Sequence, residues 1–245
     1  MEATWRLRIH RAPVFVLGCQ KAGTTAISRL LAAATGNTYM YDVLYFYPKN
    51  PSTPLNVYVR RHSAQFAAAV NKDPNFTFLL NELTDVFPRA RFVFVVRNPV
   101  QNVRSILTRL GLPGHLSVLE SSQLKRVIDS GWYWLIESRA SSGRCEGYVE
   151  AVAELWRRHA AVYLRESSRL LLTRYEDFLA DKVGEIRRVA ANAGLIPDRE
   201  IAHMVDRQFQ PRGDQSTDRA AFFGPENLAV IDSVCAEGME KFGYG

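Results

Sequence analysis

Three short, nearly continuous apolar runs stand out along the chain, at residues 14–17, 91–96 and 170–173. Runs of this kind, rich in Val, Phe and Leu, are typical of strands in a parallel sheet that is buried on both faces. Each run is followed by a segment whose apolar residues recur at helical spacing. The pattern therefore predicts an α/β fold, with a central parallel sheet flanked by helices.

The helical pattern after the first run begins near Gly23 and ends at Gly36. Further helices are predicted at residues 100–107, 149–165, 181–193 and 226–241. Segments rich in Pro, Gly and polar residues are predicted as loops, at residues 48–54, 111–114, 141–147 and 210–225. The last of these is long for a compact domain, which is typical of a functional or a disordered segment.

The chain has 245 residues, and we expect residues 1–245 to form a single domain. Its apolar runs are too short for a membrane helix or a signal peptide, so we expect a cytoplasmic protein, and its Arg and Ala content suggests a bacterial one. The three cysteines are far apart, which argues against a disulfide framework and a zinc site. The net charge is +6, but the basic residues are scattered, which favours a small anionic ligand over nucleic acid.

The stretch "VFVLGCQKAGTT" joins the first predicted strand to the first predicted helix. It resembles the nucleotide-binding loop G-x-x-x-x-G-K-[ST], except that Thr24 stands where the lysine belongs and Lys21 lies before the second glycine. Its glycines allow close backbone approach, and a helix N-terminus favours an anion. The stretch therefore predicts a phosphate- or sulfate-binding loop.

The second strand ends in Arg97-Asn98-Pro99, where a nucleotide triphosphatase would have an acidic ligand for Mg²⁺. An arginine at that place can bind a phosphate through two hydrogen bonds. Ser105 follows two turns along the next predicted helix. The sequence thus predicts two anion sites and no metal.

The motifs "QKAGTT", "RNPVQNVRS" and "RYEDF" together resemble sulfotransferases that use 3′-phosphoadenosine 5′-phosphosulfate (PAPS). The resemblance runs over nearly the whole chain and is closer to the carbohydrate branch of the family than to the cytosolic branch, whose base is a histidine. It implies that Lys21 stabilises charge on the leaving phosphate. The 5′-phosphate would be held by the segment that also contains Ala22, Gly23, Thr24, Thr25 and Ala26.

For the other end of the nucleotide, the resemblance implies that Arg97 and Ser105 bind the 3′-phosphate. Tyr175 would contact the adenine, although a tyrosine at a strand end is equally typical of a core position. Arg212 and Gly213 resemble part of a late Arg-Lys-Gly segment that covers the 3′-phosphate, with the lysine missing here.

Transfer of a sulfuryl group to a hydroxyl needs a base that accepts the proton. The carbohydrate branch has a glutamate in a segment like Glu-x-x-Phe-Phe, and "YDVLYFY" places Asp42 at that spacing. Lys72, in "NKDPNFTFLL", resembles an active-site lysine of the same branch, the alternative being a solvated surface lysine. His62 is the rival base, although its surroundings do not reproduce the motif of the histidine branch.

The acceptor is expected to be a hydroxyl on a carbohydrate, a lipid or a secondary metabolite. Tyrosines crowd residues 39–47, beside Asp42, and line either an aromatic or sugar pocket or simply the core. Other readings stay open: a Mg²⁺-dependent P-loop kinase or nucleotide triphosphatase, a binding protein for nucleotides or nucleic acid, and an inactive sulfotransferase homologue.

Overall fold

The computed structural model describes residues 6, 8–45, 47, 53–130, 132, 147–209 and 218–244. The chain divides into two compact units. The first unit contains residues 1–96 and 162–210, and the second contains residues 97–161 and 211–245.

The first unit is built on a five-stranded parallel sheet with the order β2-β3-β1-β4-β5. The strands are β1 (Val14–Gly18), β2 (Tyr39–Tyr41), β3 (Val70–Lys72), β4 (Arg91–Val96) and β5 (Leu170–Arg174). All residues of β1 are buried, as expected for a central strand covered on both faces. In its core the Phe15 ring packs edge-on against Phe76 at 4.8 Å and Phe87 at 5.1 Å between ring centroids.

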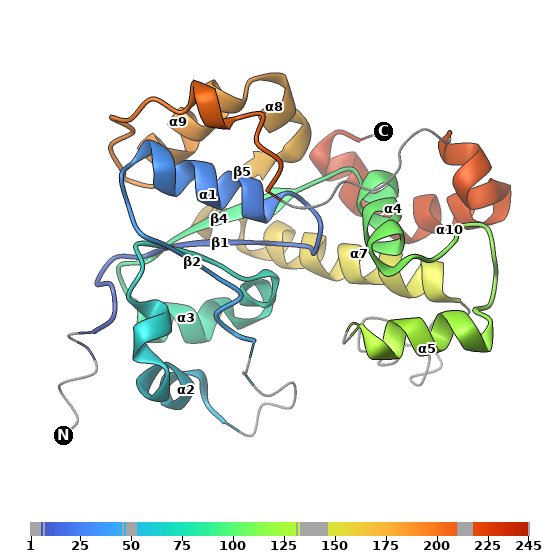
Figure 1. The fold of residues 1–245 in the computed structure, drawn as a ribbon, viewed down its shortest axis with the longest axis horizontal. Helices are drawn as coiled ribbons and strands as arrows, with labels where there is room; N and C mark the ends of the chain where they lie inside the picture. Colours follow the sequence, from blue (N-terminus) through green and yellow to red (C-terminus); the bar gives the residue numbers. More distant parts are fainter. Residues whose placement is uncertain are drawn as a thin grey trace. The chain divides into compact units, whose positions relative to one another are not determined.

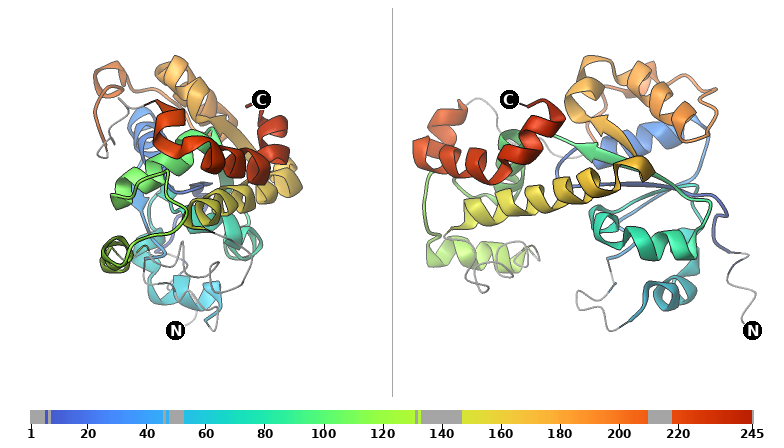
Figure 2. Two further views of the ribbon diagram at one scale, coloured as in Figure 1. Left: turned by 90° about the vertical axis from the view of Figure 1, so that its right-hand side faces the viewer. Right: turned by 180° about the vertical axis from the view of Figure 1, so that it is seen from behind.

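Helices cover both faces of this sheet. Figure 1 shows α1 (Thr24–Ala34), α8 (Tyr175–Ala180) and α9 (Lys182–Asn192) on one face, with α2 (Leu55–Arg61) and α3 (Leu80–Val86) on the other. The view from behind in Figure 2 shows the same arrangement. Short 3₁₀ helices lie between these elements: η2 (Ser63–Phe66), η3 (Pro74–Leu79), η4 (Ser167–Arg169) and η5 (Ala202–Met204).

The second unit is helical. It contains α4 (Pro99–Leu110), α5 (Ser121–Asp129), α10 (Arg219–Phe242) and most of α7 (Tyr148–Glu166), whose residues from 162 onward belong to the first unit. Trp156 of α7 is central to its core: the ring lies 6.1 Å from that of Phe242, and the indole N–H donates to the Arg97 carbonyl oxygen at 2.8 Å. A Cβ on Gly238 would lie 2.7 Å from the Trp156 ring, so this glycine lets α10 approach α7 closely.

The α/β class, the parallel sheet and the three apolar strands are confirmed. The prediction of a loop over residues 210–225 is wrong from Arg219 onward, because α10 begins there and is interrupted at Gly224 (φ 71°, ψ 166°), just before Pro225. Within the described ranges, no helix is both long and apolar enough to cross a membrane.

Candidate active site

The predicted anion-binding loop connects β1 to α1, and its two glycines are required by geometry. Gly18 has φ +136°, and a Cβ there would lie 2.2 Å from the Val95 carbonyl oxygen of β4. Gly23 is the N-cap of α1 with φ +105°, and a Cβ there would lie 2.3 Å from the Tyr175 ring. A side chain is excluded at both positions by neighbouring protein atoms, so the loop needs glycine there to pack against β4 and Tyr175.

The first turn of α1 suits an anion. It reads Thr24-Thr25-Ala26-Ile27, without an acidic residue, and the glycine at its N-cap has no side chain to bond the first N–H groups. The Ala22 N–H donates to the Cys19 carbonyl at 3.1 Å, and the Ala26 N–H donates to the Gly23 carbonyl at 3.1 Å. Contacts to a phosphate are therefore expected from Thr24 and Thr25 more than from Ala22 or Ala26.

Two of the predicted catalytic residues have an unfavourable backbone conformation. Among the described residues, Lys21 (φ 65°) and Asp42 (φ 48°) are the non-glycine residues with positive φ. Such conformations cost on the order of 1 kcal/mol or more and concentrate at functional sites. The Asp42 conformation turns the chain out of β2, and the Tyr45 N–H donates back to the Asp42 carbonyl at 3.0 Å.

Asp42, which follows β2, and Lys72, which ends β3, are joined by a side-chain and a backbone hydrogen bond. The Lys72 ammonium donates to Asp42 Oδ1 at 2.8 Å, and the Asp42 N–H donates to the Lys72 carbonyl at 2.7 Å. The Lys72 side chain is 7% exposed and that of Asp42 is 50% exposed. The surface-lysine alternative for Lys72 is therefore wrong, whereas Asp42 presents a carboxylate oxygen toward solvent.

The residues that follow Lys72 hold this pair and the anion-binding loop together. We call residues 72–77 the bracket segment. Asp73 is 3% exposed: Oδ1 accepts the Asn75 N–H at 2.9 Å, which caps η3, and Oδ2 accepts the Leu44 N–H at 3.0 Å. Thr77 Oγ1 accepts the Gly18 N–H at 3.2 Å.

Burial raises the pKa of Asp73 from its ordinary 3.8 to about 6, against the two backbone hydrogen bonds and the Lys72 charge, which lower it. Sequence reasoning did not single out Asp73 or Thr77. An Asp-Pro pair is a helix-start signal, and it was available in "NKDPNF".

Tyr175 lies against the loop, because its ring is the group that a Gly23 side chain would meet. It begins α8 and lies 5.9 Å from the Phe178 ring. The structure therefore places Tyr175 beside the predicted phosphate site. Its role as an adenine contact stays a prediction.

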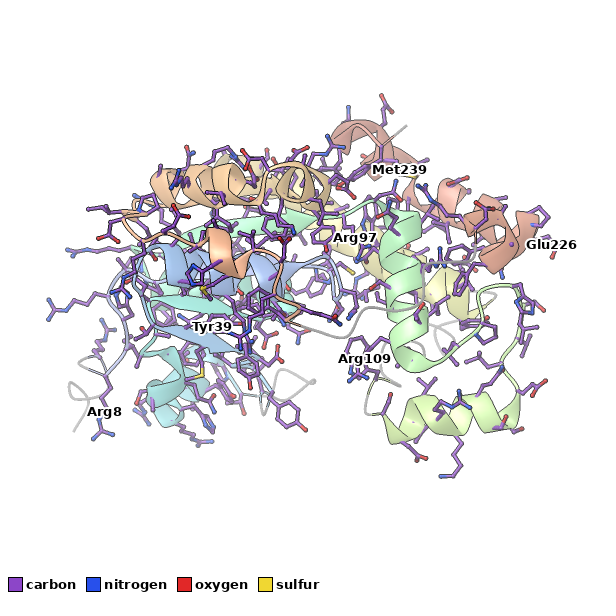
Figure 3. All side chains as sticks on the ribbon, turned by 45° about the horizontal axis from the view of Figure 1, so that its top comes forward. Arg8, Tyr39, Arg97, Arg109, Glu226 and Met239 are labelled. Carbon is purple, nitrogen blue, oxygen red and sulfur yellow. The ribbon has the colours of Figure 1, made fainter. Side chains whose placement is uncertain are left out.

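The tyrosines beside Asp42 have different environments. Tyr39, labelled in Figure 3, and Tyr41 stack at 5.9 Å, and the Arg29 guanidinium lies 5.7 and 5.8 Å from their ring centroids. Tyr41 is 54% exposed and Tyr45 is 79% exposed, so these two are not core residues. Tyr47 instead packs edge-on against Tyr58. Phe46, which belongs to the same run, lies outside the described residues.

His62, the rival base, ends α2 and stacks on Tyr58 at 4.3 Å between ring centroids. The Tyr58 hydroxyl donates to the Val43 carbonyl at 2.9 Å, so Tyr58 links the histidine to the turn that follows Asp42. This packing is typical of a structural histidine, and its role as a base stays a prediction.

The residues predicted for the 3′-phosphate belong to the second unit. Arg97 directly follows β4 and is 8% exposed (Figure 3). Its Nη2 donates to Gln101 Oε1 at 3.4 Å. Asn98 caps α4 by accepting the Gln101 N–H at 3.2 Å, with Pro99 as the first helical residue. Ser105 lies two turns further along α4. Arg212 and Gly213 lie outside the described residues.

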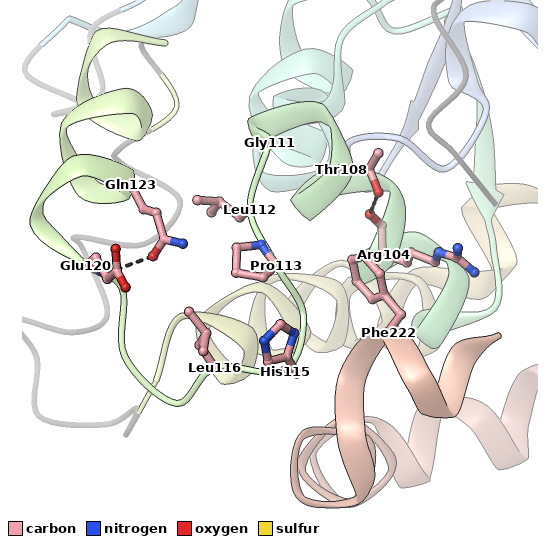
Figure 4. A pocket seen from close by; sticks show the side chains of 10 residues that line it. All are labelled: Arg104, Thr108, Gly111, Leu112, Pro113, His115, Leu116, Glu120, Gln123 and Phe222. Atoms are coloured by element: carbon pink, nitrogen blue, oxygen red, sulfur yellow. Dashed lines mark hydrogen bonds between the residues drawn. The ribbon is translucent and has the colours of Figure 1, made fainter. Parts of the chain in front are cut away.

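The second unit also has a cavity of about 620 Å³. Figure 4 shows Arg104 and Thr108 of α4 on one side of it and Glu120 and Gln123 on the other. The Arg104 guanidinium lies 5.0 Å from the Phe222 ring centroid. Among the residues that the structure describes, those that line this cavity include none of the predicted site residues. It therefore gives no support to any of the assigned roles.

Known proteins resemble this chain in sequence. A family model described as "Sulfotransferase family" matches residues 42–198, more than half of the chain, beginning at Asp42. The chain is 24% identical over 189 residues to omega-hydroxy-beta-dihydromenaquinone-9 sulfotransferase Stf3 of Mycobacterium bovis and of Mycobacterium tuberculosis. That match covers 77% of this chain but 43% of each relative, so the chain spans less than half the length of these relatives.

Solved structures share the fold. Sulfotransferase STF9 from Mycobacterium avium aligns with a TM-score of 0.59 at 13% identity, over 98% of this chain and 79% of that one. Mouse sulfotransferase SULT7A1, complexed with PAP, aligns with a TM-score of 0.54 at 13% identity, over 94% of this chain and 85% of that one. The family match over residues 42–198 establishes that the chain belongs to the sulfotransferase family.

Proposed function

We propose that this chain is a PAPS-dependent sulfotransferase that transfers a sulfuryl group to a hydroxyl acceptor. The observation that carries the proposal is the Asp42–Lys72 pair, in which a half-exposed carboxylate is held by a buried ammonium. It occurs in the same unit as a glycine-bounded loop at a helix N-terminus, which suits an anion.

The residues of the loop fit the phosphate end of PAPS. Gly18 and Gly23 give the loop its positive-φ conformation, and Thr24 and Thr25 begin the helix whose N-terminus attracts negative charge. Lys21, held at φ 65°, supplies the cation for the leaving phosphate. Arg97 and Ser105 are the proposed ligands of the 3′-phosphate, on the resemblance of "RNPVQNVRS" to the family motif.

PAPS supplies the sulfuryl group, and the chain supplies position and charge. In the transfer, the S–O bond to the 5′-phosphate breaks, a new S–O bond forms to the acceptor oxygen, and the hydroxyl proton passes to the Asp42 carboxylate. Lys72 holds that carboxylate in place and offsets the charge that spreads over the sulfuryl oxygens. Positioned proton acceptors of this kind contribute about 10²- to 10⁴-fold to the rate.

For the acceptor we propose a carbohydrate, a lipid or a secondary metabolite. Tyr41 and Tyr45 support an acceptor with a ring face, because both expose their rings close in sequence to Asp42. The Stf3 relatives, by their name, act on a hydroxylated menaquinone, which is also a hydroxyl acceptor. A cytoplasmic location and a bacterial source stay predictions from the sequence.

Transfer from ³⁵S-labelled PAPS tests the proposal, with 2-naphthol, an N-acetylglucosamine oligomer and a long-chain alcohol as acceptors. We expect label on at least one acceptor. We also expect at least 100-fold slower transfer by the Asp42→Asn variant, with unchanged affinity for adenosine 3′,5′-bisphosphate (PAP). Full activity of Asp42→Asn would refute the assignment of the base, and His62→Ala would then be the next variant to measure.

A further inference from the structure

The bracket segment, residues 72–77, contacts both halves of the proposed chemistry within the first unit. At its start, Lys72 bonds the Asp42 carboxylate. At its end, Thr77 Oγ1 accepts the N–H of Gly18, the residue at which β1 enters the anion-binding loop. Between them, Asp73 bonds the turn that follows Asp42 through the Leu44 N–H.

Asp73 fixes three pieces of backbone at once. Its carboxylate accepts the N–H groups of Leu44 and Asn75, and its own N–H donates to the Val16 carbonyl of β1 at 3.3 Å. The carboxylate is buried, as is Leu44 at 4% exposure, so water does not readily replace these bonds. A buried ionisable group is costly, and here it is used to hold a strained turn, that of Asp42 at φ 48°.

We infer that Asp73 is a positioning residue for the proposed base, and that Thr77 plays the corresponding part for the donor loop. Asp73 holds the turn that aims Asp42 at the acceptor, and Thr77 holds the start of the loop that binds the donor. The inference rests on the proposed function, because it assigns Asp73 to the placement of the base and Thr77 to the binding of the donor. It predicts that substitutions of Asp73 lower turnover, whereas substitutions of Thr77 weaken donor binding.

In Asp73→Asn one of the two carboxylate oxygens is replaced by an amide nitrogen, so one of the two N–H groups loses its acceptor. In Asp73→Ala both N–H groups lose their acceptors. We expect PAPS turnover, measured with the fastest acceptor of the panel above, to fall about 10- to 100-fold for Asn and further for Ala. The dissociation constant for PAP, measured by calorimetry, should change less than 3-fold. Asp181→Asn, which alters the carboxylate that caps α9 through the Gly184 N–H, is the matched control and should leave both quantities unchanged.

Thr77→Val keeps the shape of the side chain but removes the acceptor of the Gly18 N–H, whereas Thr77→Ser keeps that acceptor. We expect Thr77→Val to weaken PAP binding about 5- to 10-fold, and Thr77→Ser to restore most of the affinity. The reverse pattern, with Asp73 variants losing PAP affinity and Thr77→Val losing only turnover, would overturn the inference.

A measurement that needs no acceptor separates this inference from the proposed function. Hydrogen exchange of the Leu44 amide should become at least 10-fold faster in Asp73→Ala and stay unchanged in Asp181→Asn. Unchanged exchange at Leu44 in Asp73→Ala would overturn the positioning role. If the wild-type chain neither binds PAP nor transfers sulfate while Leu44 is protected by Asp73, the proposed function fails and the structural tie stands.

Discussion

Asp73 should make the folded protein more stable as the pH falls, whereas most carboxylates, whose pKa is lowered by folding, have the opposite effect. Replacement of Asp73 by asparagine should remove this pH dependence. Burial raises the pKa of Asp73 to about 6 in the folded protein, from an ordinary value of 3.8. Between these two values the folded state binds more protons at this site than the unfolded state does. Its contribution is therefore most favourable below pH 3.8 and is lost as the pH rises through 6.

The magnitude follows from the two pKa values. The full difference corresponds to about 3 kcal/mol, and moving from pH 7.5 to pH 5 recovers about 1 to 2 kcal/mol of it. The charges nearest to Asp73 act in opposite directions, since Lys72 lowers its pKa and Asp42 raises it, and both are already included in the value. Asparagine removes the titration but leaves Leu44 or Asn75 without its acceptor.

Urea denaturation at pH 7.5 and pH 5 measures this effect. The stability of the wild type minus that of Asp73→Asn should increase by about 1 to 2 kcal/mol at the lower pH. Thr77→Val removes a buried acceptor of the same segment but no titratable group, so its difference from the wild type should be the same at both pH values. A constant difference for Asp73→Asn, or one that shrinks at pH 5, would refute the reasoning.

Other substitutions test the strained and charged positions. Lys21→Gly and Lys21→Ala both remove the ammonium and should both abolish transfer. Because glycine adopts a positive φ without strain, Lys21→Gly should be the more stable of the two by about 0.5 to 1 kcal/mol in urea denaturation. Equal stability of the two variants would contradict the backbone strain at Lys21. Arg97→Ala should weaken PAP binding about 10- to 100-fold in calorimetry and hardly affect binding of adenosine 5′-phosphosulfate, which lacks the 3′-phosphate. Arg109→Ala, on the exposed part of α4, is the control and should affect the binding of neither nucleotide. Equal losses for both nucleotides in Arg97→Ala would contradict the 3′-phosphate role. Gly18→Ala should lower the free energy of unfolding by more than about 3 kcal/mol, because its Cβ would lie 2.2 Å from a carbonyl oxygen of β4. Gly194→Ala, with positive φ but open space around it, should lower it by about 1 kcal/mol. Similar losses in the two variants would argue against the close approach at Gly18.

The elements that sequence analysis predicted correctly have strong local signals. The strands β1, β4 and β5 are continuous apolar runs, and α1 and α4 each have a glycine or proline signal at an end. The strands β2 and β3 have three residues each, with two tyrosines in β2 and two polar residues in β3 in place of an apolar run. Whether such short segments form strands is therefore decided by the neighbouring strands with which they pair. Residues 219–223 were assigned to a loop because they belong to a long segment rich in polar residues, Pro and Gly, whereas in the structure they begin α10, which is interrupted at Gly224.

The candidate site shows the same division. The resemblance of short motifs was enough to single out Asp42 and Lys72, and the structure brings these two side chains to 2.8 Å across neighbouring strands. It was not enough to find Asp73 and Thr77, whose partners Leu44 and Gly18 lie 29 and 59 residues away in the sequence. Hydrogen bonds over such separations follow from the strand order β2-β3-β1, which the sequence pattern alone does not provide.

Calorimetric titration of the chain with PAP, and separately with ATP and Mg²⁺, tests the central claim most directly. The account predicts that PAP binds with the same affinity in the presence of a metal chelator, that Lys21→Ala weakens this binding, and that ATP with Mg²⁺ binds far more weakly. Preference for ATP with Mg²⁺, with loss of binding on chelation, would contradict the account and assign the loop to a nucleotide triphosphatase or kinase.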